Sequence, residues 1–216
     1  MSKQDDKKSG RTYGGMSMEQ RKVARRQQFL DAGLEVFGTT GFRSATVRGL
    51  CRQAKLTDRY FYESYGSLEK LLVAVYEDRM TNLRARIVDV VTIALPNKST
   101  EEVIHAGLDC FFNELEDPRV AKVCMVELEG VSPDVDELYH GYILGFAELI
   151  LWMTRQLYPD VDLPDDEIEV IGISIVGAMR QSATHWLRGG YAIERQTMVE
   201  ATAKLFVGLM TLVVKD

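Results

Sequence analysis

The sequence is poor in proline and cysteine and has no long hydrophobic run. Five of its 216 residues are proline and three are cysteine. Since β-sheet proteins need frequent turns, the scarcity of proline and of glycine-rich turns favours helices. Cys51, Cys110 and Cys124 are odd in number and form no C-x-x-C pair. They therefore argue against a disulfide framework and indicate a reducing compartment.

Targeting and catalytic motifs are absent as well. Residues 1–20 are polar, and the apolar run 205–214 has ten residues, fewer than the roughly 18 that span a bilayer. We therefore predict a cytoplasmic protein without membrane contact. The sequence contains no G-x-S-x-G, no phosphate-binding glycine loop and no H-E-x-x-H. His105 and Asp109 lie one helical turn apart but are too few to make a metal site. We expect no enzyme activity, no metal and no cofactor.

The net charge of −6 hides an uneven distribution along the chain. Residues 1–65 contain 13 Lys/Arg and 7 Asp/Glu, a surplus of +6, so the rest of the chain carries −12. A basic segment on an acidic body indicates a local surface for a polyanion such as nucleic acid. A merely solvated basic face is the alternative that charge alone leaves open.

Hydrophobic residues recur at steps of three and four along most of the chain, which is typical of amphipathic helices. We predict an all-α fold of nine helices without strands, with N-caps at Thr46, Thr57 and Ser67. On the first helix the apolar positions include Val23, Leu30 and Phe37. The chain then divides into a flexible basic arm (1–18), a helix-turn-helix domain (19–66) and a larger helical domain (67–216).

Residues 46–62 predict two short helices joined by a tight turn, the arrangement of a helix-turn-helix. Apolar residues such as Leu50 and Phe61 form the inner stripe, so Thr57, Arg59 and Tyr60 are left outward. The second helix of such a motif enters the major groove, where arginine can bind guanine through two hydrogen bonds. An ordinary helical hairpin with solvated charges is the alternative on spacing alone.

Residues 21–72 resemble the DNA-binding segment of the TetR (tetracycline repressor) family. The matching positions are Phe37, Gly41-Phe42, Thr46-Val47, Leu50-Cys51, Ala54, Leu56, Thr57, Phe61, Tyr62, Tyr65, Ser67, Glu69 and Leu71. Two positions depart from the family pattern. Lys55 replaces a turn glycine and would have to adopt a positive φ, at a cost of about 1 kcal/mol. Leu68 replaces a lysine that often touches phosphate, for which Lys55 or Lys70 is expected to compensate.

The resemblance implies a sequence-specific regulator of transcription, most simply a repressor released by a small-molecule effector. It implies backbone-phosphate contacts for Thr46, Arg48 and Tyr62 and base contacts for Thr57, Arg59 and Tyr60. Phosphate contacts set the register, whereas base contacts discriminate sequence. Tyr62 has an alternative as a core aromatic, since Phe61 and Tyr62 cannot both face inward. A helical ligand-binding or scaffold protein without DNA binding is the alternative function.

For residues 99–216 the resemblance extends to architecture only, and implies helices that dimerise and enclose a ligand cavity. Small residues within 171–183 and an apolar stripe on the last helix suit a homodimer bound to a palindromic operator. That stripe consists of Val199, Ala203, Phe206, Val207 and Met210. A purely intramolecular core is the alternative for these residues. Aromatic and methionine side chains are expected to line the pocket, although plain core packing would use the same residue types. The candidates are Phe111, Phe112, Met125, Tyr142, Phe146 and Trp186.

Overall fold

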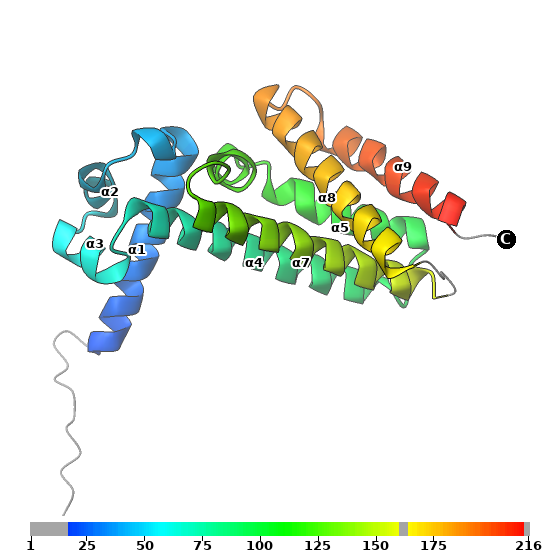
Figure 1. Cartoon of the computed structure of the whole chain (residues 1–216), viewed down its shortest axis with the longest axis horizontal. Helices are drawn as coiled ribbons and strands as arrows, with labels where there is room; N and C mark the ends of the chain where they lie inside the picture. The colour runs from blue at the N-terminus through cyan, green and yellow to red at the C-terminus, as the bar shows by residue number, and fades with distance from the viewer. Residues whose placement is uncertain (1–16, 160–163, 214–216) are drawn as a thin grey trace, which may run out of the picture.

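A computed structural model describes residues 17–159 and 164–213, which form nine α-helices and no strand (Figure 1). The all-α prediction is therefore confirmed for these residues, whereas residues 1–16 of the expected arm lie outside them. A 3-10 turn, Phe42–Ser44, follows α1, and a π-helical turn, Val123–Glu127, follows α6. The helices are α1 Met18–Thr39, α2 Val47–Ala54, α3 Asp58–Ser64, α4 Leu68–Ala94, α5 Thr100–Glu114, α6 Pro118–Lys122, α7 Pro133–Leu157, α8 Asp165–Arg188 and α9 Arg195–Val213.

Side-chain caps set several of the helix starts. The hydroxyl groups of Thr46 and Ser67 each accept a hydrogen bond from a backbone N–H three residues later, at 3.1 Å. Thr57 occupies the N-cap position of α3 but makes no capping hydrogen bond. Ser17 and Gln20 form a reciprocal capping box that starts α1, a signal that the sequence analysis missed. The two predicted caps at Thr46 and Ser67 are thus confirmed in full.

The molecule is elongated, with α1, α2 and α3 gathered at one end (Figure 1). From there α4, 27 residues long, runs along the body beside α7, and α8 crosses over it. At 1.5 Å per residue α4 extends about 40 Å. Helix α5 packs on both α4 and α9. One continuous hydrophobic core joins the two ends, from Phe29 in α1 to Ala203 in α9.

Two expectations from periodicity need correction. Val23 does not join the core but is 59% exposed, because the N-terminal part of α1 extends beyond α2 and α3 (Figure 1). On α9, Val199 and Ala203 are each 2% exposed within the single chain, because α9 packs closely on α5. These two residues therefore belong to the chain's own core. Any partner would meet a different face of α9.

Some of the small residues on α8 allow close packing against another helix of the same chain. A Cβ added to Gly172 would lie 3.1 Å from the Cβ of Ala147 on α7, so this glycine allows the two helices to approach. A Cβ added to Gly177 would meet nothing within 4 Å. No helix in the described part of the chain is both long and apolar enough to cross a bilayer.

Candidate DNA-binding surface and ligand channel

Three aromatic rings hold α3 against α1. Phe61 is fully buried and meets Phe29 edge to face, with ring centroids 5.6 Å apart. Tyr65 packs on the same Phe29 ring at 6.3 Å and donates a hydrogen bond to the Arg26 carbonyl at 3.0 Å. Arg26 in turn donates to the Ser64 carbonyl at 2.6 Å. The middle and the C-terminal end of α3 are therefore fixed to α1, and its outer face is held in one orientation.

The turn between α2 and α3 has the left-handed backbone that its sequence predicts. Lys55 has φ 55° and ψ 35°, a conformation that costs a non-glycine residue about 1 kcal/mol or more. The N–H of Leu56 then donates to the Cys51 carbonyl at 3.0 Å and closes the turn. This backbone turns the chain sharply between the two short helices, so α3 can cross α2.

The outer face of α3 presents Arg59 and Tyr62 to solvent. The Arg59 side chain is 82% exposed and its Nε donates to Glu63 Oε1 at 2.8 Å. Tyr62 is 59% exposed, so the core alternative for this residue is wrong and Phe61 alone faces inward. Tyr60 is half-buried, with the Arg25 guanidinium 4.4 Å above its ring centroid. Sequence reasoning missed the contacts of Glu63 and Arg25, although Glu63 is four residues from Arg59, one turn away.

Exposed polar residues flank this face. Thr46 and Arg48 lie at the start of α2, Lys55 in the turn and Thr57 at the start of α3, and all four are exposed. The Thr46 hydroxyl accepts from the Gly49 N–H and still has its own proton to donate. The residues named from the sequence thus lie on α2, α3 and the turn between them, and all are exposed except Tyr60, which is half-buried.

Helix α6 packs tightly on the end of α1. A Cβ added to Gly38 would lie 2.4 Å from Arg119 Cβ and 2.5 Å from its Cα, so only glycine fits here. Arg119 Nη1 donates to Glu35 on α1 at 2.8 Å, and its Nη2 donates to Asp117 at 2.6 Å. Hydrogen bonds from Arg119 lower the pKa of Asp117. The role of Gly38 is therefore close packing between α1 and α6.

The π-helical turn joins the end formed by α1–α3 to the body formed by the later helices. Phe42, just after α1, donates its backbone N–H to Glu127 Oε2 at 2.7 Å. Lys122 Nζ donates to the Thr39 carbonyl at 2.8 Å and lies 3.8 Å from Glu127 Oε1. Met125 of the same turn lines the cavity described next. A short segment therefore contacts both the end of α1 and the interior of the body.

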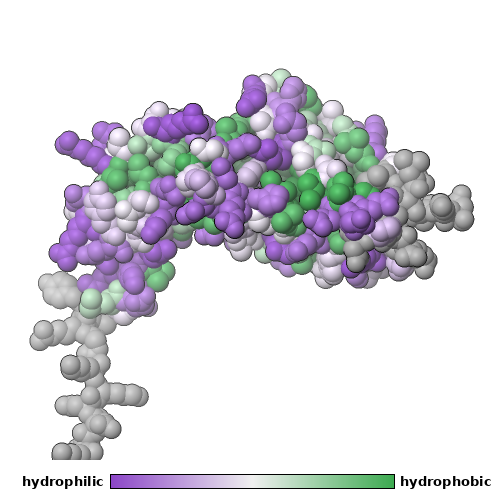
Figure 2. All heavy atoms as spheres, in the orientation of Figure 1, coloured by the Kyte–Doolittle hydropathy of each residue, from purple (hydrophilic) through white to green (hydrophobic). Residues whose placement is uncertain are grey.

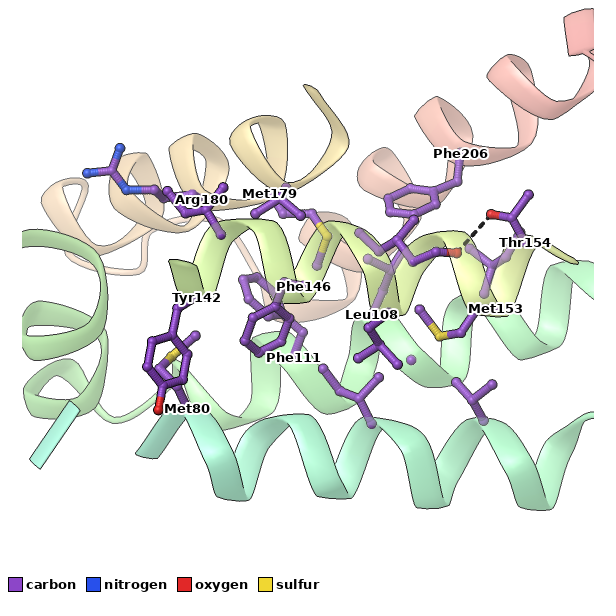
Figure 3. Close-up of a pocket in the computed structure, with 18 of the residues that line it drawn as sticks. Met80, Leu108, Phe111, Tyr142, Phe146, Met153, Thr154, Met179, Arg180 and Phe206 are labelled. Atoms are coloured by element: carbon purple, nitrogen blue, oxygen red, sulfur yellow. Dashed lines mark hydrogen bonds between the residues drawn. The ribbon is translucent and has the colours of Figure 1, made fainter. Parts of the chain in front are cut away.

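A narrow cavity, here called the channel, runs between α4, α5, α7, α8 and α9 (Figure 3). Its empty space is about 1070 Å³ with the mouth included, of which about 110 Å³ admits the centre of a water-sized molecule. Lining residues of α7 extend from Tyr139 to Leu157, a rise of about 27 Å along the helix. Apart from Cys124, Thr154, Arg180 and four tyrosines, the lining residues are apolar.

The structure places four of the six pocket candidates in the channel and two outside it. Phe111, Met125, Tyr142 and Phe146 are lining residues; the other two are Phe112 and Trp186. The rings of Phe112 and Trp186 pack on each other with centroids 5.8 Å apart. Phe112 is one residue further around α5 than Phe111, a rotation of about 100°, and it therefore faces α8 instead of the cavity.

Several lining residues were missed by the sequence analysis. They come from α4, α5, α7, α8 and α9, and Figure 3 labels several of them, among them Met80, Met153 and Phe206. On α7 the positions 139, 142, 146, 149 and 153 form a stripe at helical spacing, which could have located that wall. The other walls come from helices far apart in sequence and carry no comparable signal. The missed residues include Tyr76, Met80, Met153, Met179, Arg180 and Phe206.

The described residues contain no cluster that could hold a metal ion, and their three cysteines are buried. No group of three or more His, Cys, Asp or Glu in this part of the chain could hold a metal ion. Cys51, Cys110 and Cys124 are free and buried. Burial raises the pKa of Cys124 to about 12, so this channel-lining thiol stays protonated and unreactive at neutral pH.

The geometry of α1–α3 defines the class of protein. A fixed turn, a sealed aromatic core and an exposed second helix form a helix-turn-helix, and the protein is a DNA-binding regulator of transcription. Residues 29–75 match the family model described as bacterial regulatory proteins, tetR family. The helix-turn-helix segment of the chain is therefore similar to the DNA-binding segment of that family.

Known proteins are similar to this chain in sequence or in fold. The chain is 22% identical over 185 residues to the HTH-type transcriptional activator FasR of Mycolicibacterium smegmatis, covering 85% of this chain and 82% of FasR. The fatty acid degradation regulator FadR from Bacillus halodurans has a TM-score of 0.73 at 17% identity, covering 85% and 95% of the two chains. FadR from Bacillus subtilis in complex with stearoyl-CoA also has a TM-score of 0.73 at 17% identity, covering 84% and 97%. FasR is named as a transcriptional activator, FadR from Bacillus subtilis as a transcriptional regulator and FadR from Bacillus halodurans as a fatty acid degradation regulator.

Proposed function

We propose that the protein is a repressor that binds a palindromic operator as a homodimer and releases it when a long acyl chain enters the channel. Residues 19–66 would form the DNA-binding domain, and residues 67–216 the domain that dimerises and binds the effector. The observation that carries the proposal is the channel. It is narrow and largely apolar and extends about 27 Å along α7, as an extended hydrocarbon chain requires.

In this proposal α3 lies in the major groove of DNA. Thr57, Arg59 and Tyr60 contact base edges. Arg59 exchanges its hydrogen bond to Glu63 for hydrogen bonds to a base. Arg59 is the most suitable base reader, because its exposed guanidinium can bind guanine bidentately. Tyr60 reaches a base only from its outer edge, since Arg25 covers one ring face. Phosphate contacts come from Thr46, Arg48, Lys55 and Tyr62, all of which are exposed.

The dimer would form through α8 and α9. Val170 on α8 is 64% exposed and Leu205 on α9 is 60% exposed. Figure 2 shows hydrophobic residues gathered where α8 crosses the body. Burying such a surface against its two-fold mate is favourable. The mate would present a second α3 for the next major groove, roughly 34–36 Å away.

The names of the relatives support an acyl effector. FadR from Bacillus subtilis was solved with stearoyl-CoA, and FadR from Bacillus halodurans is described as a fatty acid degradation regulator. The channel of this chain has walls of Leu, Ile, Met and Phe side chains, which give an unbranched chain contact on every side. Methionine side chains adapt to chains of different lengths.

A gel-shift titration tests this proposal. The purified protein should shift DNA from upstream of its own gene, and stearoyl-CoA at micromolar concentration should release the shifted DNA. Arg59→Ala, which removes a base contact, should weaken the shift even without ligand. Tighter DNA binding upon addition of stearoyl-CoA would reverse the sense of regulation, as in the activator that FasR is named for. Absence of any shift with selected or upstream DNA would favour the alternative of a ligand-binding protein without DNA binding.

A further inference from the structure

One end of the channel is polar although most of its wall is apolar. The Tyr76 ring lies 5.9 Å from that of Tyr139 and 5.1 Å from that of Tyr142, centroid to centroid. The Arg180 guanidinium lies 5.3 Å from the Tyr139 ring centroid. All four residues line the channel, and Arg180 and Tyr142 occupy the same end of it in Figure 3. This group is called the polar end below.

Arg180 has unused hydrogen-bonding capacity. Its Nη2 donates to Glu129 Oε2 at 2.6 Å and to the Met125 carbonyl at 3.4 Å. Its Nε is buried and has no hydrogen-bond partner. A guanidinium has five N–H donors, and a buried donor without a partner is unfavourable. Arg180 is therefore able to bind a further acceptor that enters the channel.

The neighbouring tyrosines are also donors. Burial raises the pKa of Tyr76 and of Tyr139, so both hydroxyl groups stay protonated at neutral pH. A phenol next to a guanidinium can donate to the same oxygen atom. The polar end therefore suits an oxygen acceptor that bears negative charge or a strong dipole.

The opposite end of the channel offers less to such an acceptor. Its wall includes Met153 and Phe206 (Figure 3). The Thr154 hydroxyl there already donates to the Ile150 carbonyl at 2.9 Å. Arg180 is the one charged residue among those that line the channel in the described part of the chain. The charge on the channel wall therefore lies at one end, whereas the polar residues of the other end, Thr154 and Tyr158, are uncharged.

We propose that Arg180 binds the carboxyl-derived oxygen of an acyl ligand, whose hydrocarbon chain then lies along α7 towards Phe206. This assignment rests on the acyl effector proposed above. The oxygen belongs either to the carboxylate of a free fatty acid or to the carbonyl of its thioester. Burying a carboxylate without a cation is very unfavourable, and the planar fork of arginine suits two oxygens. Glu129 is the internal competitor that the ligand oxygen displaces from Arg180.

The test compares three ligands with the same chain, using the purified full-length protein and titration calorimetry. Stearate carries a carboxylate, stearoyl-CoA a thioester, and 1-octadecanol neither. Arg180→Gln should weaken stearate binding by about tenfold or more and leave 1-octadecanol unchanged. Arg180→Lys should recover part of the loss, since it restores the charge. Arg188→Gln, an exposed position on the same helix, is the matched control and should change nothing.

The loss of affinity in Arg180→Gln, compared between the ligands, distinguishes the two possible sources of the oxygen. A loss with stearate alone assigns the carboxylate. A loss with stearoyl-CoA that free coenzyme A does not share assigns the thioester carbonyl, because the phosphates of coenzyme A also bind arginine. Glu129→Gln removes the competitor and should tighten binding of the responding ligand several-fold, whereas Glu137→Gln should not. Because Glu129 is 67% exposed, this second variant does not depend on the stability of the core.

Three results would overturn the assignment. Equal losses for all three ligands in Arg180→Gln would show a structural role. Unchanged affinities in both Arg180→Gln and Glu129→Gln would place the oxygen elsewhere. If the unaltered protein bound none of the three ligands, the acyl effector itself would be wrong, and this assignment with it. The first two results leave the acyl effector standing, so the two failures are distinguishable.

Discussion

The two ends of the molecule place their functional side chains in opposite ways. In α1–α3 a sealed core, with Phe61 fully buried, supports exposed residues such as Arg59. In the body, the residues of interest point inward, around a channel that the core leaves unfilled. Stability and function should therefore separate easily at the DNA-binding end, where neighbouring residues serve one or the other. In the body the same side chains serve both.

The largest expected effect tests that separation within α3. Phe61→Ala should destabilise the protein by about 3–5 kcal/mol, because it leaves a cavity against Phe29, and should abolish DNA binding. Tyr62→Ala, next along the chain but exposed, should change stability by less than about 0.5 kcal/mol while weakening DNA binding. Thermal unfolding and gel shift measure the two quantities. Equal destabilisation by the two substitutions would contradict the separation.

A second substitution tests the junction between the two ends. Gly38→Ala should cost about 1–3 kcal/mol, because its Cβ would meet the Arg119 backbone at 2.5 Å and backbone cannot rotate away. Gly141→Ala is the matched control, since this helical glycine has nothing within 4 Å of an added Cβ. It should stabilise the protein by up to about 1 kcal/mol. Chemical denaturation distinguishes them, and a stabilising Gly38→Ala would show that α1 and α6 do not pack as described.

A third pair compares base and phosphate contacts. Arg59→Ala should weaken operator binding by about 1–3 kcal/mol and relax selectivity at one base pair. Arg48→Ala should instead weaken binding to all sequences alike and flatten the salt dependence. Binding titrations with operator and scrambled DNA at several salt concentrations measure both effects. Unchanged affinity and selectivity for Arg59→Ala would show that Arg59 is not a base reader.

The smallest effect concerns backbone strain. Lys55→Gly should stabilise the protein by up to about 1 kcal/mol, because glycine adopts a positive φ without penalty. The converse change, Gly130→Ala, places a side chain at φ 73° with nothing within 4 Å, so any loss of about 1 kcal/mol there is due to the backbone alone. Melting temperatures measure the change in stability for both substitutions. A lower melting temperature for Lys55→Gly would mean that the greater freedom of the unfolded chain outweighs the strain.

The same contrast explains what could be predicted from the sequence. The cap at Thr46 follows from a local pattern, since it depends on neighbours within a few residues. The positive φ of Lys55 was expected from the resemblance to the TetR family, and that resemblance also implied an outward Tyr62, for which a core position was the alternative. The pair Arg59 and Glu63 was missed but has a local signal, four residues of spacing. Arg25 over Tyr60 has none, because it depends on how α1 lies against α3.

The channel could be predicted only in part, for a different reason. Phe111 and Phe112 are both buried, and composition does not distinguish a ring that borders empty space from one that borders another ring. That difference arises when helices from distant parts of the chain pack together. Arg180 was missed because a lone arginine on a helix has no pattern that separates a pocket residue from a surface one.

The π-helical turn has a consequence for how the two ends move. Met125 in the channel wall and Glu127, which holds the backbone of Phe42, are separated by a single residue. The backbone between these two residues is too short to absorb a displacement of Met125 without moving Glu127. Displacement of the Met125 backbone by a bound molecule therefore reaches the connection between α1 and α2 through two peptide units, a far shorter route than the length of α4.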